Sequence, residues 1–442
     1  MTACAPETAT TSSTPGRPGL TIAADGSYAA RLALGGPAGT TGGWFPERWT
    51  LTGPEPYAVP LPGSQPEEPD SEVLPLTDGR VLIRRRVAER HTLTLLYPTG
   101  PGTGEVPLGA VECERLALLP PAPDGSSVYA LAPGRHGTDL WLVHGGSFGP
   151  EHVAEVPGRC TGGSWLDRTG RLLALDRELD GRTKAVVVDL ERGGETSPLL
   201  QITRESDDRL LFADPDSGLL LVRSDAPGEP RLGWGVLGSL LPVRFPECLR
   251  VPGGTATPFA VQPGQSLTPE ACAVAFRIDG TGAPGGGAAG PWVGVWRPLG
   301  RQLQQFPAPV GWLTGAGLWT PGGRLLLPYA TPQVPCGLAR LLLPPPGPGA
   351  EPQPRRGTPP EAGPPARAAE QGAGARTLPE ERADGHEAGA QPSSEAQDAG
   401  QAAQQAGGAG EPLPPEAPRP VPLQQAPLHQ TSPQQTPLGQ SH

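Results

Sequence analysis

The sequence predicts an all-β fold, a seven-bladed β-propeller followed by a long disordered tail. Three observations predict it: short apolar stretches bounded by Gly, Pro and Asp, a turn that recurs about every 45 to 53 residues, and an abrupt change of composition after Pro344. A period in the forties with four short strands per period is typical of propeller blades. Six or eight blades are the alternative counts.

The clearest strands lie within residues 124–156. Here 128–131 and 140–143 are aliphatic or aromatic, and each run is bounded by Gly, Pro or Asp. A helix needs about 10–12 uninterrupted residues with apolar side chains spaced near 3.6, and no such run fits between these turn residues. Asp124 and Gly125 supply the positive φ angles of a tight turn. The stretch therefore predicts consecutive antiparallel strands.

A glycine in the turn between the first two strands marks each repeat unit. The markers are Gly26, Gly79, Gly125, Gly170, Gly218 and Gly323. The first four intervals are 53, 46, 45 and 48 residues, and the last gap of 105 residues is about two periods. We place the turn of the additional unit at 268–270, which gives seven units. A β-sandwich would explain the strands but not the regular interval.

The domain boundaries follow from composition. Residues 1–18 are rich in Thr, Ser and Pro, which predicts a disordered segment, and the propeller extends over 19–343. The seventh unit ends after three strands at Leu343. Because an open ring would expose two strand edges, we expect a strand from before Thr21 to pair with this last blade.

Residues 344–442 form the predicted tail. They contain no Phe, Trp or Tyr, and Val421 is their only β-branched aliphatic residue. Such a segment cannot bury enough apolar surface to offset its chain entropy. Its part from Pro412 to Leu428 has polyproline-II character and could dock into an aromatic groove. The alternative is a solvating tail with no partner.

Charge and hydropathy exclude several classes of partner. The formal net charge of −11 at pH 7 argues against a nucleic-acid binder, which would carry a basic surface. No stretch approaches the ~18 apolar residues of a membrane span. The N-terminus lacks the basic and apolar regions of a signal peptide. We therefore expect a cytoplasmic protein with neither a nucleic-acid nor a membrane partner.

The sequence offers no metal or cofactor pattern. Its six cysteines are scattered without a C-x-x-C pair, so free buried thiols are expected rather than disulfides. Histidines are too few and too dispersed for zinc. Asp207, Asp208, Asp214 and Asp216 lie near one blade but lack the spacing of an EF-hand loop. We expect Asp214 and Asp216 to cap turns, and no metal or cofactor to be bound.

Two features resemble a known group of propellers. One is the Pro123-Asp124-Gly125 turn, and the other is Trp141 near the end of a third strand. They resemble TolB-like propellers and the propeller that caps prolyl-oligopeptidase-family serine peptidases. The resemblance covers about residues 20–343 and implies a propeller here without an attached hydrolase domain. No Gly-His…Trp-Asp pairs of the WD40 type recur.

Ser147 is the one catalytic candidate. It occupies the nucleophile position of a G-x-S-x-G match at 145–149. In an α/β-hydrolase that serine sits on a turn from a strand to a helix, but 150–153 is too short for the helix. After it, only His152 precedes the predicted tail. We favour a Gly-rich turn between the third and fourth strands of a blade.

Two pairs of residues are candidates for binding. Trp44 and Trp49 lie in a loop-rich region of the first unit, and an exposed pair there would form a binding surface. Arg84 and Arg86 share one face of a predicted strand, and Arg85 lies on the other. A solvated strand face is the simpler expectation for these arginines, and an anion-facing ring in the channel is the alternative.

These observations favour a non-catalytic propeller that acts as a protein-interaction or scaffold module, with a flexible tail that extends its reach. We expect a protein partner, and the sequence predicts no particular oligomeric state. The alternative is a hydrolase-type propeller that acts on a peptide or glycan, or a cap that gates a separately encoded catalytic partner. Hydrolysis abolished by Ser147→Ala would favour that alternative.

Overall fold

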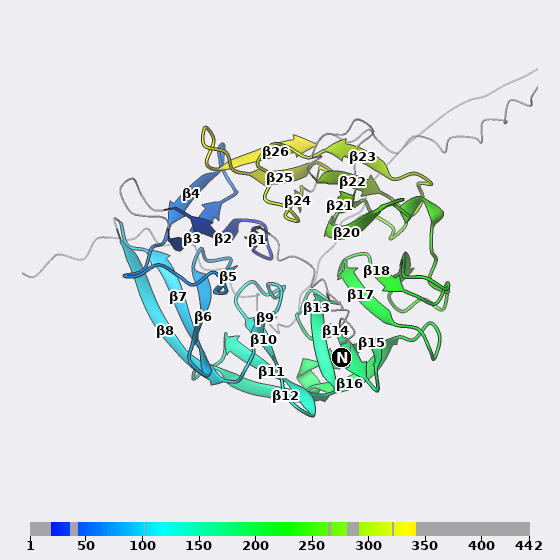
Figure 1. Ribbon diagram of the computed structural model, residues 1–442, viewed down its shortest axis with the longest axis horizontal. Helices are drawn as coiled ribbons and strands as arrows, with labels where there is room; N and C mark the ends of the chain where they lie inside the picture. Colours follow the sequence, from blue (N-terminus) through cyan, green and yellow to red (C-terminus); the bar gives the residue numbers. More distant parts are fainter. Residues whose placement is uncertain are drawn as a thin grey trace, which may run out of the picture. The chain divides into compact units, whose positions relative to one another are not determined.

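Seven antiparallel sheets stand around a central axis, as Figure 1 shows. The computed structural model describes residues 19–35, 43–100, 102–263, 267–280, 291–320 and 322–341. In these residues the only helices are two 3-10 turns, Leu190–Arg192 and Glu247–Leu249. The predicted all-β, seven-bladed propeller is confirmed. The predicted disordered segments at 1–18 and 344–442 lie outside the described residues.

The first four blades each contain four strands that follow one another from the axis outward (Figure 1). Blade 1 contains β1 (Thr21–Ile22), β2 (Tyr28–Leu34), β3 (Trp44–Thr50) and β4 (Tyr57–Pro60). Blade 2 contains β5 (Glu72–Pro75), β6 (Val81–Val87), β7 (Arg90–Pro98) and β8 (Thr103–Glu112). Blade 3 contains β9 (Ala117–Leu118), β10 (Val128–Pro133), β11 (Gly137–His144) and β12 (Glu151–Pro157). Blade 4 contains β13 (Arg159–Trp165), β14 (Leu172–Leu179), β15 (Arg182–Asp189) and β16 (Glu195–Leu200).

Blades 5 and 7 have three strands each among the described residues, and blade 6 has four. Blade 5 contains β17 (Asp208–Ala213), β18 (Leu219–Ser224) and β19 (Arg231–Val236). Blade 6 contains β20 (Gly254–Val261), β21 (Val274–Gly280), β22 (Trp292–Trp296) and β23 (Gln304–Pro307). Blade 7 contains β24 (Leu318–Trp319), β25 (Leu325–Tyr329) and β26 (Gly337–Leu341).

The marker glycines explain the repeat. All six lie between the first and second strands of a blade, with φ angles between 72° and 83° that favour glycine. In five of these turns an Asp before the glycine accepts backbone N–H bonds, as at Asp124, whose Oδ1 lies 3.1 Å from Ser126 N and 2.9 Å from Ser127 N. The predicted turn of the additional unit, at 268–270, lies between β20 and β21.

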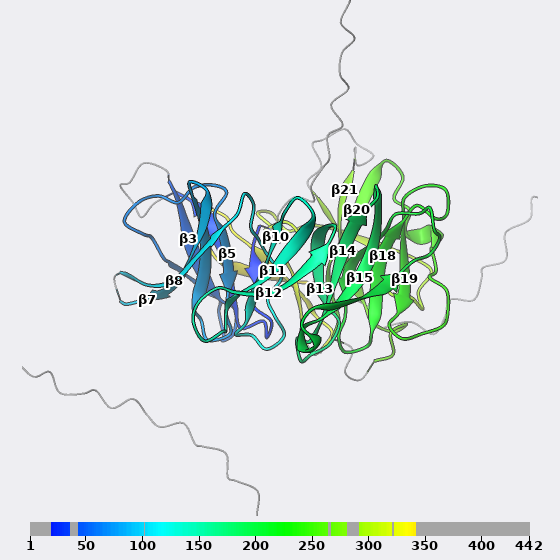
Figure 2. The ribbon, with the colours of Figure 1, turned by 90° about the horizontal axis from the view of Figure 1, so that it is seen from below.

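Buried apolar clusters fill the spaces between neighbouring blades. Blades 5 and 6, for example, share a cluster that contains Trp234, Phe276 and Trp296. Figure 2, which views the ring from its edge, shows the sheets side by side. A sheet of three or four short strands is unstable alone, so each blade depends on its neighbours for burial.

The ring closes where blade 1 meets blade 7. The Gly19 N–H donates to Thr314 O at 3.1 Å, and Leu20, Trp49 and Ala316 share one buried cluster. In the part of the chain that the structure describes, packing rather than an exchanged strand makes this closure. The strand that we expected from before Thr21 would come largely from residues outside that part.

Candidate functional site

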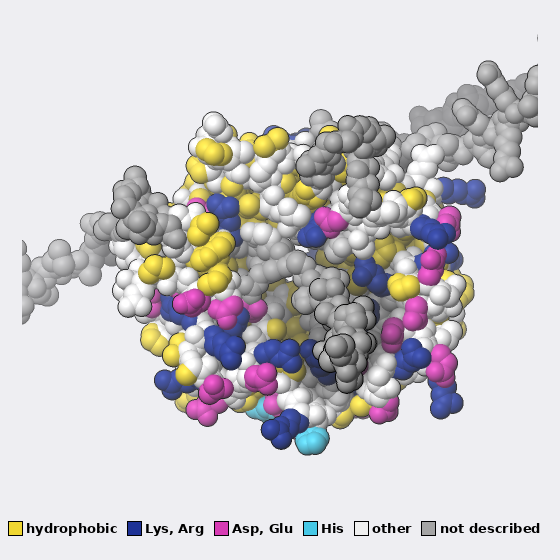
Figure 3. Space-filling view, in the orientation of Figure 1, with side chains coloured by type: hydrophobic (Ala, Val, Ile, Leu, Met, Phe, Trp, Pro, Cys, Tyr) yellow, Lys and Arg dark blue, Asp and Glu magenta, His cyan; other side chains and the backbone are white. Residues whose placement is uncertain are grey.

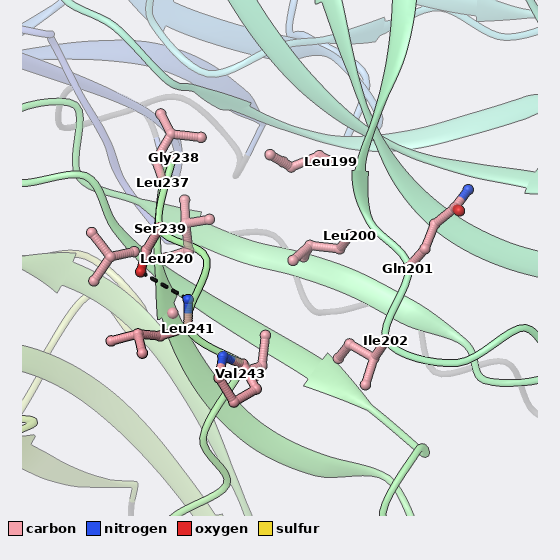
Figure 4. A pocket seen from close by; sticks show the side chains of 13 residues that line it. Leu199, Leu200, Gln201, Ile202, Leu220, Leu237, Gly238, Ser239, Leu241 and Val243 are labelled. Atoms are coloured by element: carbon pink, nitrogen blue, oxygen red, sulfur yellow. Dashed lines mark hydrogen bonds between the residues drawn. The ribbon is translucent and has the colours of Figure 1, made fainter.

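An apolar groove of about 330 Å³ lies between blades 4 and 5 (Figure 4). One wall is the end of β16 and the residues after it, represented by Leu200 and Ile202. The other is the chain after β19, represented by Leu237 and Val243. Leu220 of β18 also lines the groove and belongs to the cluster between the two blades. The groove therefore continues the apolar interior to the surface.

Blade 5 shapes this groove because its described strands number three. Beyond β19, the only described pairing in place of a fourth strand is a two-bond bridge, in which Trp234 and Arg244 exchange N–H···O bonds of 2.9 Å. Residues 237–243 leave the sheet between the end of β19 and this bridge.

The loop 237–243 is held by hydrogen bonds within blade 5. Leu237 N donates to Gly218 O at 2.8 Å, and Ser239 N donates to Val236 O at 3.1 Å. The Ser239 hydroxyl accepts from Leu241 N at 3.1 Å, which is the dashed line in Figure 4. These bonds keep the groove wall in place without a strand.

Two leucines of the loop are exposed to solvent. Leu240 is 103% exposed and Leu241 is 63% exposed, although both are strongly apolar. The residues that line the groove include no charged and no aromatic side chain. Exposed apolar side chains beside an apolar groove are typical of surfaces that bind another molecule.

A buried polar network fixes one wall of the groove. Lys184, the only lysine of the chain, donates from Nζ to Thr203 O at 2.6 Å, to Ser206 O at 2.6 Å and to Asp208 Oδ2 at 2.7 Å. Asp208 is fully buried and also accepts from Ile202 N at 3.0 Å. Burial opposes ionisation of Asp208, but Lys184 and the other donors lower the pKa of its carboxyl. The network ties Ile202 to the body of blade 5.

The contacts of the acidic residues near blade 5 agree only in part with those that the sequence predicts. Asp214 caps its turn as predicted, since its carboxylate accepts from Asp216 N and Ser217 N. The prediction for Asp216 is wrong, because its carboxylate accepts from both Nε and Nη2 of Arg168 in blade 4. Sequence reasoning considered turns only, whereas this ion pair joins two blades.

Ser147 lies on the turn between β11 and β12, as predicted. Its side chain is exposed, and its backbone N–H donates to Glu151 Oε1 at 2.8 Å. Nε2 of His152 lies 3.0 Å from Asp139 Oδ1. No described side chain forms a hydrogen bond with the Ser147 hydroxyl. A catalytic role for Ser147 stays a prediction.

Trp44 and Trp49 do not form an exposed pair. Trp49 is 0% exposed because it fills the space between blades 1 and 7, and its Nε1 donates to Glu47 Oε2 at 2.8 Å. Trp44 is half-buried, and its backbone bridges to Glu67. A partner could contact Trp44 only in part and Trp49 only after rearrangement.

The three consecutive arginines of β6 have different surroundings. Arg84 is 5% exposed, and its Nη2 donates to Asp70 O at 2.6 Å, so the solvated strand face that we expected does not include it. Burial lowers the pKa of the Arg84 guanidinium. Arg85 pairs with Glu67 at 2.7 Å, and Arg86 is exposed. Binding at Arg84 or Arg86 stays a prediction.

The described residues show neither a metal cluster nor a membrane-spanning helix. They contain no group of three or more His, Cys, Asp or Glu side chains arranged for a metal ion. None of their helices is long and apolar enough to span a membrane. Their five cysteines are free thiols, as predicted, but only Cys160 and Cys272 are fully buried, and Cys4 lies outside the described residues. Burial raises the pKa of Cys160 to about 11. Figure 3 shows acidic and basic side chains interspersed on one face of the ring.

Comparison with known proteins finds only distant structural matches. No protein-family model and no curated protein sequence matches the chain. Among solved structures, TolB from Acinetobacter baumannii shares 13% identity over 71% of this chain and 80% of its own, with a TM-score of 0.38. The β-propeller domain of the Trilobed protease from Pyrococcus furiosus shares 10% identity over 71% of this chain and 90% of its own, with a TM-score of 0.45.

Prolyl oligopeptidase B from Galerina marginata matches 70% of this chain with 46% of its own length, at 11% identity and a TM-score of 0.42. TolB and a prolyl oligopeptidase are thus among the solved structures to which this chain is similar. The described residues hold the propeller and no hydrolase domain.

Proposed function

We propose that this protein is an interaction module whose groove between blades 4 and 5 binds an extended aliphatic segment of a partner protein. The observation that carries the proposal is the exposure of Leu240 and Leu241 beside the groove. Burial of one leucine side chain contributes about 1.5–3 kcal/mol. Association itself costs several kcal/mol, so burial of these two leucines gives little net free energy, and we expect weak, transient binding.

The lining of the groove favours this occupant over others. A charged segment would lose hydration without gaining a counter-charge, because no lining side chain is charged. The proline-rich part of the tail, for which an aromatic groove was expected, would find no aromatic side chain in the lining. An extended segment suits a groove of about 330 Å³ better than a helix, which with its side chains is about 10–12 Å wide.

Selection from a displayed library of ten-residue peptides tests the proposal with the full-length protein. Enriched peptides should carry aliphatic side chains two residues apart, because these point to the same side of an extended chain. Their affinity, measured by fluorescence anisotropy, should fall at least about tenfold in Leu241→Glu, which adds a charge at the groove edge. Leu299→Glu changes another leucine, 70% exposed and outside the groove, and should leave the affinity within about twofold.

Two outcomes would overturn the proposal. One is that the selected peptides bind Leu241→Glu with the same affinity as the wild-type protein. The other is tight binding of a synthetic peptide that spans Pro412–Leu428, which would make the groove a site for the chain's own tail.

A further inference from the structure

A second cavity, of about 300 Å³, lies between blades 5 and 6 and is independent of the groove. Arg223 of β18 and Leu232 of β19 line it on the side of blade 5, and Ala256 of β20 lines it on the side of blade 6. The residues around the 3-10 turn Glu247–Leu249 complete its wall. Three arginines, Arg223, Arg231 and Arg250, face this one space.

The nearby carboxylates neutralise only two of these arginines. Arg231 pairs with Glu247 at 2.7 Å, and Arg250 pairs with Glu229 at 3.0 Å and with Glu247 at 3.5 Å. Arg223, in contrast, makes no ion pair and no side-chain hydrogen bond with any described residue. One positive charge in the cavity therefore lacks a counter-charge.

The surroundings of Arg223 make its unpaired charge costly. Its side chain is half-buried, and its direct cross-strand neighbour is Arg209, whose guanidinium reaches Thr183 and Asp176 of blade 4. Burial, and then the repulsion from Arg209, lower the pKa of the Arg223 guanidinium, yet arginine stays protonated. An anion beside Arg223 would relieve both costs.

Apolar side chains line another part of the cavity, whose further polar residues are Thr255 and Glu229, the partner of Arg250. Leu232, Leu249 and Val251 line it, and Leu249 is only 3% exposed. These side chains pack in the cluster between blades 5 and 6, and a short hydrocarbon chain would cover the apolar surface that they still expose in the cavity, whereas a free inorganic ion would not. Each buried CH₂ group contributes about 0.8 kcal/mol.

We propose that this cavity binds an organic anion, whose carboxylate or phosphate group pairs with Arg223 and whose hydrocarbon part packs against Leu232 and Leu249. A guanidinium has a planar arrangement of donors that matches both kinds of oxyanion through two parallel hydrogen bonds. The cavity thus adds a small-molecule site to the propeller, separate from peptide binding.

Calorimetric titration of the full-length protein with hexanoate and with hexyl phosphate tests this site and distinguishes the two head groups. At least one of the two probes should bind. If the site prefers the carboxylate, acetate should bind at least about tenfold more weakly than hexanoate, because acetate lacks the hydrocarbon part. Arg223→Gln should weaken binding at least about tenfold, and Arg223→Lys should weaken it less, since the charge remains.

Arg182→Gln is the matched control. Arg182 is 47% exposed in blade 4, outside the cavity, and its variant should bind within about twofold of the wild type. The proposal is overturned if neither probe binds at about 10 mM, or if Arg223→Gln binds as tightly as Arg182→Gln. Far-UV circular dichroism of both variants verifies that the propeller is folded.

Discussion

Replacement of Lys184 by methionine should destabilise the propeller far more than an ordinary lysine substitution. Lys184 Nζ makes an ion pair with the fully buried Asp208 and three further hydrogen bonds, to Thr203 and Ser206. Methionine retains most of the side-chain length but removes every one of these interactions. The Asp208 carboxylate is then left buried without its cation.

The expected magnitude follows from the partners that remain. Loss of one member of a buried ion pair costs about 3–5 kcal/mol. Asp208 keeps hydrogen bonds from the Ser206 hydroxyl at 2.9 Å, the Ser224 hydroxyl at 2.6 Å and Ile202 N at 3.0 Å. These donors place the expected loss at the lower end, about 3 kcal/mol, which is a large part of the stability of a typical domain.

Urea unfolding at pH 7, followed by tryptophan fluorescence, measures the loss. Arg182→Met is the control on the same strand, because Arg182 lies 4.0 Å from Glu205 and both are largely exposed. An exposed pair contributes about 0–1 kcal/mol. The reasoning would be refuted if the free energy of unfolding of Lys184→Met lay within about 0.5 kcal/mol of that of this control.

The loss should also depend on pH. The pKa of Asp208 is lowered in the folded state, so its contribution is present above the ordinary carboxyl pKa and disappears as the pH falls through the folded value. The difference between the wild type and Lys184→Met should therefore shrink below about pH 4. A difference that grows on acidification would contradict this assignment.

Three further substitutions test other parts of the fold. Burial raises the pKa of Asp176 to about 6, so ionisation of this carboxyl destabilises the folded state. In urea unfolding between pH 4 and pH 7, the free energy of unfolding of Asp176→Asn should therefore exceed that of the wild type by up to about 3 kcal/mol. Trp49→Ala should cost about 3–5 kcal/mol in the same assay, because it empties the contact between blades 1 and 7, and a loss below about 1 kcal/mol would contradict that role. Gly125→Ala should lower the thermal midpoint more than Gly181→Ala, since both have positive φ but only the first would place a Cβ 2.4 Å from the Thr77 side chain.

The fold could be predicted because its repeat is local. Each marker glycine, such as Gly79 or Gly170, adopts a positive φ within one turn, and that requirement is visible in a few neighbouring residues. Short apolar strands between such turns leave few architectures other than a propeller. The seven turns predicted from the sequence therefore correspond to the seven blades of the structure.

The positions of individual side chains could not be predicted in the same way. Trp49 is buried by residues such as Ala316, which lies more than 260 positions further along the chain. Lys184 reaches Asp208 in the next blade, and Arg168 reaches Asp216 across the same boundary. Such contacts depend on how the blades pack against each other, and the residue pattern of a single turn or strand does not determine that packing.

The groove was missed for a related reason. Residues 237–243 fall in the interval without a marker glycine, where a fourth strand of blade 5 was assumed. The available signal was Leu240 and Leu241 between Gly238 and Pro242, which is an apolar pair inside a turn-forming stretch. An apolar pair at such a place indicates a loop with exposed leucines rather than a strand.

Methyl NMR spectra of the full-length protein, recorded with and without a selected peptide, test the central claim most directly. The account predicts shift changes concentrated on the groove methyl groups of Ile202, Leu241 and Val243. Leu325, buried in blade 7, should stay unchanged. Changes centred on another blade, with these groove methyl groups unmoved, would contradict it.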